Sequence, residues 1–138
     1  MKILAFCLIF VISTHLNAAT ITYLYVDGSG NRFLIIGDSR KTIKYVPVSA
    51  EQSSSGTYSG GEAVVKIINE REYSTLMDYY KKAMGNKKIR IPNRIKGSGY
   101  ISTQSATDSQ QKGYILNGSA SEKKELEAYL FFLIGRVQ

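Results

Sequence analysis

The first half of the chain is a succession of short runs of β-branched and aromatic residues, each closed by turn-forming residues. The run "TITYLYV" ends at the cluster 27–31, and the run from Arg32 to Ile36 ends at "GDSR". β-branched and aromatic residues favour strands, while Gly, Asp, Asn and Ser favour the turns between them. The pattern predicts a β-hairpin with a glycine-bearing loop and a third strand in "KTIKYVPV". Pro47 predicts an edge position for this third strand, because proline cannot donate to a strand ladder.

Two later stretches have a helical period instead. Asn69 lies three residues before Glu72, and Ser119 lies three residues before Glu122, which are capping-box spacings that predict helix starts. Gly85 is placed to end the first helix. Each helix carries an apolar stripe at steps of three and four, made of Tyr73, Leu76, Met77, Tyr80 and Met84 in the first and of Leu126, Tyr129, Leu130, Leu133 and Val137 in the second. Such stripes are typical of helices that cover a core.

The remaining apolar runs, "AVVKII", "KKIRIPNRI", "GYIST" and "GYIL", are short enough to be strands. Residues 96–98 are predicted as the turn of a hairpin between the second and third of them. The order of strands, helix, strands and helix predicts an α+β fold, an antiparallel sheet of about five to seven strands covered by two helices. A chain of 138 residues suits one such domain, which we place at residues 19–138.

The first eighteen residues have the three-part pattern of a secretory signal peptide. Lys2 precedes an apolar run from Ile3 to Ser13, and small residues follow up to Ala18 and Ala19. The apolar run is shorter than the roughly 20 residues that cross a bilayer. The pattern predicts a signal peptide at residues 1–18, cleaved after Ala18, and therefore a periplasmic or secreted protein.

Cleavage would remove the chain's single cysteine, Cys7, and its single histidine, His15. Nucleophilic triads need an imidazole base and thiol catalysis needs a thiolate, so residues 19–138 exclude both. Zinc and copper sites built on imidazole or thiolate are excluded with them. The sequence predicts a protein that is not an enzyme, with no catalytic residues, metal or cofactor.

The chain is basic, with 18 Lys and Arg against 11 Asp and Glu and a net charge of +7. An exported chain of this charge would meet an anionic envelope surface or an acidic protein rather than nucleic acid. The densest basic stretch alternates with isoleucine on a predicted strand, which would gather its charges on one face. Its members are Lys87, Lys88, Arg90, Arg94 and Lys96. The alternative is an ordinary solvated surface.

The stretch "SSSGTYSGG", from Ser53 to Gly61, places one aromatic side chain among very small residues. A flexible tether needs no aromatic residue, whereas Tyr58 on a narrow loop would be a rigid contact group able to enter a cleft. The alternative is a serine-glycine hairpin loop whose tyrosine is partly buried.

Within this loop, Ser55-Gly56-Thr57-Tyr58 resembles the Ser-Gly-(x)-x-Tyr motif of bacterial periplasmic lysozyme inhibitors. The resemblance covers four residues, and the motif comes early in this chain. It implies that the loop enters the catalytic cleft of a hydrolase, with Ser55 and Tyr58 making the contacts. Because this chain is basic, an acidic lysozyme or another envelope hydrolase is a better electrostatic match than a basic lysozyme.

These features together predict a periplasmic binding protein that inhibits a cell-wall hydrolase such as lysozyme, or gives immunity against one, through the loop Ser53–Gly61. The alternative is an envelope-associated protein that binds anionic glycan or lipid through Lys87–Lys96. Ionic strength separates the two, because a basic patch loses affinity steeply as salt rises and an aromatic loop in a cleft does not.

The predicted cleavage is tested by the mass of the exported protein. We expect intact-mass analysis of the envelope fraction to find a chain that begins near Ala19, because the small-residue end of the signal pattern lies there. Recovery of all 138 residues from that fraction would contradict the assignment.

Overall fold

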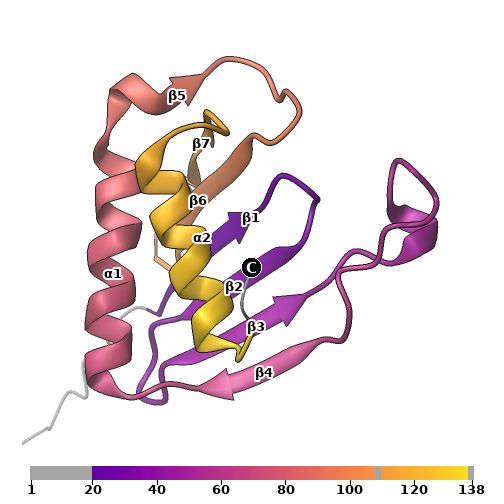
Figure 1. The fold of residues 1–138 in the computed structure, drawn as a ribbon. Helices are drawn as coiled ribbons and strands as arrows, with labels where there is room; N and C mark the ends of the chain where they lie inside the picture. The colour runs from indigo at the N-terminus through magenta and orange to yellow at the C-terminus, as the bar shows by residue number, and fades with distance from the viewer. Residues whose placement is uncertain (1–19, 108–109, 137–138) are drawn as a thin grey trace, which may run out of the picture.

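The computed structural model describes residues 20–107 and 110–136 (Figure 1). The predicted signal peptide at residues 1–18 and Val137 of the second stripe lie outside these residues. The elements in chain order are β1 (Ile21–Val26), β2 (Arg32–Ile36), β3 (Thr42–Val46), the 3-10 turn η1 (Ala50–Gln52), β4 (Val64–Ile67), α1 (Glu70–Gly85), the 3-10 turn η2 (Lys87–Ile89), β5 (Arg90–Ile91), β6 (Gly99–Ser105), β7 (Lys112–Leu116) and α2 (Ser121–Leu133).

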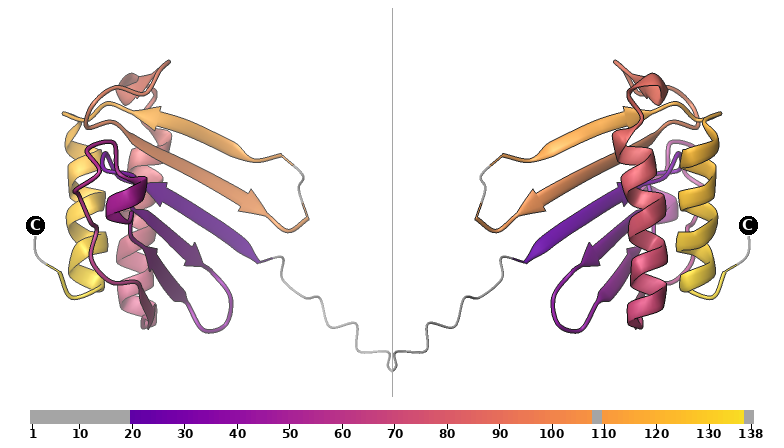
Figure 2. Two further views of the ribbon diagram at one scale, coloured as in Figure 1. Left: turned by 90° about the vertical axis from the view of Figure 1, so that its right-hand side faces the viewer. Right: turned by 90° about the vertical axis from the view of Figure 1, so that its left-hand side faces the viewer.

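The strands form one antiparallel sheet of seven strands in the order β4-β3-β2-β1-β6-β7-β5. Both helices pack side by side on one face of this sheet (Figure 2). The α+β fold expected from the sequence, with five to seven strands and two helices, is therefore confirmed. No helix among the described residues is both long and apolar enough to cross a bilayer.

The core lies between the sheet and the helices. In the central strand, Tyr25 is opposite Phe33 on β2 and Ile101 on β6, and all three are fully buried. Directly opposed residues share a face of the sheet, so this register directs three large side chains toward the helices. From the helices the core receives the predicted stripe residues Leu76, Met77, Tyr80, Leu126, Leu130 and Leu133.

Tyr80 also connects α1 to the sheet by a polar contact. Its buried hydroxyl lies 2.5 Å from the carbonyl oxygen of Ser102 on β6 and 3.1 Å from that of Leu24 on β1. Burial raises the pKa of Tyr80 above its ordinary value, because the phenolate would lose its hydration. The hydroxyl therefore stays protonated and available as a donor to the main chain.

The opposite face of the sheet carries the alternate residues of each strand. On the edge strand β4, Val65 is 69% exposed and Ile67 is 63% exposed. Arg32 and Lys44 lie on the same face of β2 and β3, because Arg32 is opposite Val46 and Lys44 is opposite Val65. Neither helix covers this face in the side views (Figure 2).

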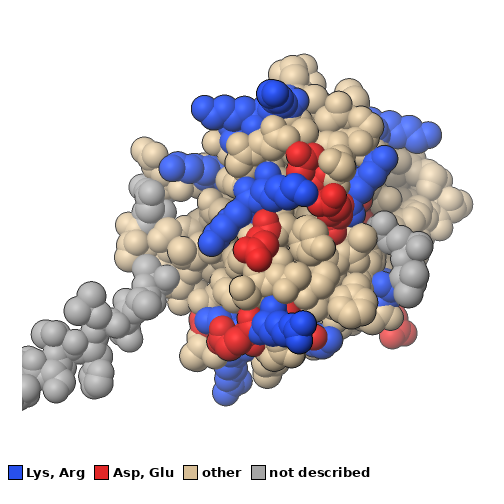
Figure 3. All heavy atoms as spheres, turned by 60° about the vertical axis from the view of Figure 1, so that its left-hand side comes forward, with Lys and Arg blue, Asp and Glu red and all other residues tan. Residues whose placement is uncertain are grey.

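The outer surface of the helices is charged and mixed in sign. Figure 3 shows Lys and Arg interspersed with Asp and Glu on the side of the molecule that carries α1. One pair links the two helices, because Lys82 Nζ lies 2.8 Å from Glu125 Oε2. Both side chains are largely solvated, so we expect this pair to add little to stability.

The predicted edge position of the third strand is wrong. β3 pairs with β2 on one side and with β4 on the other. Pro47 follows the last residue of β3, so its missing N–H group removes no ladder hydrogen bond. The edge strand on this side of the sheet is β4.

The predicted hairpin around residues 96–98 is also wrong. Only Arg90 and Ile91 of the run "KKIRIPNRI" are extended, and they pair with β7. Pro92 follows Ile91 directly, which is consistent with the strand ending there. β6 already has β1 and β7 as neighbours, so it has no free edge for another strand.

The first predicted capping box is present and the second is not. The Asn69 side chain accepts from the Glu72 N–H at 2.8 Å, and the Glu72 carboxylate accepts from the Asn69 N–H at 2.9 Å. In the second helix the N-cap is Ala120, and the Ser119 hydroxyl donates to the Asn117 side chain at 3.0 Å instead. The first helix ends at Gly85, as predicted, but Gly85 is its last helical residue rather than the C′ residue, and Asn86 is the C-cap.

The two faces of the sheet predict opposite responses to truncation. Leu76→Ala should lower the free energy of unfolding by about 3 kcal/mol, because it leaves a cavity in the core. Val65→Ala, on the uncovered face, should change it by less than about 1 kcal/mol. Urea denaturation of both variants measures the difference, and equal losses would mean that Val65 belongs to a second core.

Candidate functional site

Three connecting segments lie at one end of the sheet (Figure 1) and together line one hollow, namely the β1–β2 turn 27–31, the Ser-Gly loop Ser53–Gly61 and the turn 94–98 before β6. Two adjacent hollows lie among them. The loop hollow, of about 200 Å³, is lined by Gly28, Ser29, Ser53, Ser54, Ser55, Tyr58 and Lys96. The helix hollow, of about 320 Å³, is lined by Asp27, Gly28, Ser29, Lys96, Gly97, Lys123 and Glu127.

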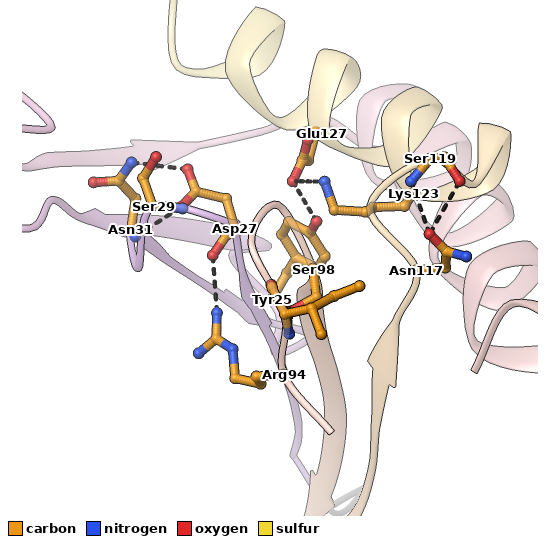
Figure 4. Close-up of polar contacts among 11 residues, drawn as sticks. Tyr25, Asp27, Ser29, Asn31, Arg94, Ser98, Asn117, Ser119, Lys123 and Glu127 are labelled. Carbon is orange, nitrogen blue, oxygen red and sulfur yellow. Dashed lines mark hydrogen bonds and ion pairs between the residues drawn. The ribbon is translucent and has the colours of Figure 1, made fainter. Parts of the chain in front are cut away.

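The β1–β2 turn is held by the buried carboxylate of Asp27. Asp27 Oδ1 accepts from the N–H groups of Ser29 and Asn31, both at 2.9 Å. Asp27 Oδ2 accepts from Asn31 Nδ2 at 2.8 Å (Figure 4). A side chain that bonds its own following backbone in this way replaces part of a turn's main-chain hydrogen bonding. The turn, and with it Ser29, has a defined position.

Asn31 joins this turn to the Ser-Gly loop. Besides Asp27, its Nδ2 donates to the Tyr58 hydroxyl at 2.9 Å, and its Oδ1 accepts from the Val48 N–H at 2.9 Å. The contact is close enough to require glycine in the loop, because a Cβ on Gly60 would lie 2.1 Å from Asn31 Oδ1. This tie accounts for one of the two glycines at the end of "SSSGTYSGG".

The Ser-Gly loop is shaped by Ser55 and Gly56. Ser55 Oγ accepts from Thr57 Oγ1 at 3.1 Å and from the N–H groups of Tyr58 at 3.3 Å and Thr57 at 3.4 Å. Gly56 has a φ of +71°, a conformation that glycine adopts without strain. Tyr58 is 40% exposed although its hydroxyl is bound to Asn31. Tyr58 thus combines the two alternatives that the sequence left open.

The end of the loop is anchored to the C-terminal part of the chain. Arg136 donates to the carbonyl oxygen of Gly60 and, at 2.7 Å, to that of Glu62. The Tyr45 hydroxyl donates to the same Gly60 oxygen at 2.9 Å, and the Arg136 guanidinium lies 4.8 Å from the centre of the Tyr45 ring. Arg136 and Tyr45 therefore hold the end of the loop at Gly60, and Asn31 holds it at Tyr58.

A buried ionic network lies beneath the helix hollow (Figure 4). Glu127 Oε1 accepts from Lys123 Nζ at 2.7 Å and from the Tyr25 hydroxyl at 2.5 Å. Burial, and then the Glu127 carboxylate, raise the pKa of Tyr25 far above its ordinary value, so Tyr25 stays protonated. Sequence reasoning missed this network. The available signal was Lys123 itself, a charged residue at helical spacing with the stripe residues Leu126 and Leu130.

The five residues of the predicted basic patch do not share one strand face. Lys87 and Lys88 lie on η2, and Arg90 on β5 donates to the Met84 carbonyl at 2.8 Å with its guanidinium 3.5 Å from the centre of the Tyr114 ring. Arg94 donates to the Asp27 carbonyl at 3.2 Å. Only Lys96 lines the hollows, and the expected single face is wrong because the strand stops before Pro92.

The four residues of the Ser-Gly motif, Ser55 to Tyr58, are all exposed at the tip of their loop. Ser55 and Tyr58 both line the loop hollow, and Gly56 and Thr57 are exposed between them. Among the described residues, no three His, Cys, Asp or Glu lie close enough to hold a metal ion. The Ser-Gly loop supplies hydroxyl groups to the loop hollow, and Lys96 on the neighbouring turn 94–98 supplies one cation.

Comparison with known proteins adds no family to this description. No protein-family model matches the chain, and no curated protein matches it in sequence.

The buried network predicts a non-additive effect on stability. Lys123→Met should destabilise the fold by about 3 kcal/mol or more, because it leaves the Glu127 carboxylate buried without its cation. Adding Glu127→Gln to this variant should recover most of the loss, since the amide oxygen still accepts from Tyr25 and carries no charge. Urea denaturation of the single and double variants tests this, and additive losses would contradict it.

Proposed function

We propose that the protein is an exported, periplasmic or secreted, binding domain that blocks a cell-wall hydrolase through the Ser-Gly loop. The observation that carries this proposal is a pre-shaped loop with a half-exposed aromatic ring, Tyr58, held in place by Asn31. A contact group that is already ordered loses little conformational freedom on binding. Aromatic side chains of this kind commonly supply most of the energy of an interface.

The shape of the loop supports a cleft as the target. The neighbours of Tyr58 are serine, threonine and glycine, so no bulky side chain widens the tip. The resemblance of Ser55–Tyr58 to the inhibitor motif points to the same kind of partner. A protein that gives its own cell immunity against an injected wall hydrolase would use the same contact and belongs to the same proposal.

A binding role also agrees with the chemistry of the described residues. They contain no cysteine or histidine, because the chain's only examples are Cys7 and His15. The hydroxyl of Ser55 accepts hydrogen bonds from Thr57 and Tyr58 of its own loop, so it is engaged in holding the loop's shape. This supports a protein that occupies a hydrolase rather than one that performs hydrolysis.

The rival proposal, binding of anionic glycan or lipid through Lys87–Lys96, has weaker support. Arg90 and Arg94 are engaged with the protein's own carbonyl groups. Lys87 and Lys88 lie on a separate turn from Lys96. Charges dispersed in this way form a poorer site for a flat anionic surface than a single strand face would.

The proposal is tested against a panel of purified wall hydrolases that includes acidic and basic lysozymes and an amidase. We expect at least one to lose activity on wall suspensions when the exported chain is added. Tyr58→Ala should weaken that binding by about 2 kcal/mol, roughly 30-fold, as aromatic contact residues do. Phe132→Ala is the matched control, because Phe132 is 65% exposed on α2 and should leave binding unchanged.

Two results would count against the proposal. Thermal melts should place Tyr58→Ala near the wild type, and a variant that melts as early as Leu76→Ala would make the loop part of the architecture. Binding that is lost at high salt and is unaffected by Tyr58→Ala would favour a charged patch over a cleft contact.

A further inference from the structure

We propose that the loop hollow is a carboxylate-binding subsite in which Lys96 supplies the positive charge. The inference rests on the proposed function for the source of the carboxylate, an acidic side chain of the bound hydrolase. Tyr58 and Lys96 both line the loop hollow. A partner that contacts the Tyr58 ring therefore places its neighbouring side chains beside Lys96.

The lining of the hollow is rich in donors and contains no acid. Lys96 makes no hydrogen bond or ion pair with any residue that the structure describes. The hydroxyls of Ser29 and Ser54 are likewise without partners among the described residues. One cation and two free hydroxyls around a space of about 200 Å³ match the charge and the acceptor oxygens of a single carboxylate.

The carboxylate of Asp27, in the adjacent β1–β2 turn, does not serve as the partner of Lys96. Asp27 is buried, and its two oxygens already accept three hydrogen bonds from the β1–β2 turn. In the neighbouring helix hollow, Glu127 is paired with Lys123. Lys96 is the cation that remains for an external anion among the residues lining the two hollows.

The turn that carries Lys96 is held in position. The buried Ser98 hydroxyl donates to the Ile95 carbonyl at 2.7 Å and accepts from the Ile95 N–H at 3.2 Å. Gly97, with φ of +79°, packs against the β1–β2 turn so closely that a Cβ on Gly28 would lie 2.9 Å from its Cα. These contacts place the backbone of Lys96 next to Ser29 before any ligand arrives.

The subsite can be tested without a partner. The probe is N-acetylglycine, and its neutral match is N-acetylglycinamide. In NMR titrations of the exported chain, the acid should produce saturable shifts of the amide signals of Gly28, Ser29 and Gly97, and the amide should not. Lys96→Gln should abolish the shifts, whereas Lys112→Gln, at the other end of the β6–β7 pair, should retain them. Absence of saturable shifts in the wild type would overturn the subsite.

The second arm uses whichever hydrolase the panel identifies. Lys96→Gln should weaken its binding at least about tenfold, as loss of a charge-assisted contact does, and Lys112→Gln should not. A loss for Tyr58→Ala with none for Lys96→Gln would refute the subsite and leave the proposed function standing. Saturable binding of N-acetylglycine with no hydrolase bound would uphold the subsite and refute the hydrolase as its source.

Discussion

The arrangement of the candidate site depends on one buried amide, that of Asn31. Its nitrogen donates to Asp27 in its own turn and to Tyr58 in the Ser-Gly loop, and its oxygen accepts from the backbone after β3. A buried amide is tolerated only when its donors and acceptor are paired, and here the bonds to Tyr58 and Val48 connect the turn to two other segments of the chain. The Tyr58 side chain is therefore hydrogen-bonded to Asn31, which belongs to the turn at the end of the sheet. This bond allows a loop of small residues to present a fixed surface.

The local sequence pattern predicts where helices and strands lie, but it does not predict which strands pair with each other. The runs ending at Ile36 and the stripe through Leu76 depend on residues a few positions apart, and both were predicted correctly. Strand pairing depends on contacts between distant parts of the chain, and a local sequence pattern carries no information about such contacts. β5 illustrates this, since it pairs with β7 rather than with β6, whose two edges are already paired with β1 and β7. The edge position inferred from Pro47 is wrong for a related reason. A proline excludes an inner strand only when it lies within that strand, and β3 ends at Val46, before Pro47.

The same division applies to the site. Tyr58 was predictable because its contrast with small neighbours is visible in the sequence. Asn31 was not, since its importance arises from a bond across 27 positions. Lys96 was identified as part of a basic run, yet its surroundings differ from those of Arg90 and Arg94, which are committed to the fold. The density of positive charge in the sequence points to Lys96. Only the three-dimensional structure distinguishes it from Arg90 and Arg94, whose guanidinium groups bond the main chain.

The charge of the whole chain and that of the site lead to the same kind of partner. A chain with a net charge of +7 repels a basic target at long range, and this slows association before any contact forms. At short range, Lys96 beside Tyr58 would face a like charge in such a target and would lose its hydration without compensation. An acidic partner reverses both effects, since attraction accelerates encounter and a carboxylate replaces the lost water. Under the proposed function, the expected partner is therefore a wall hydrolase with an acidic cleft rather than a basic lysozyme.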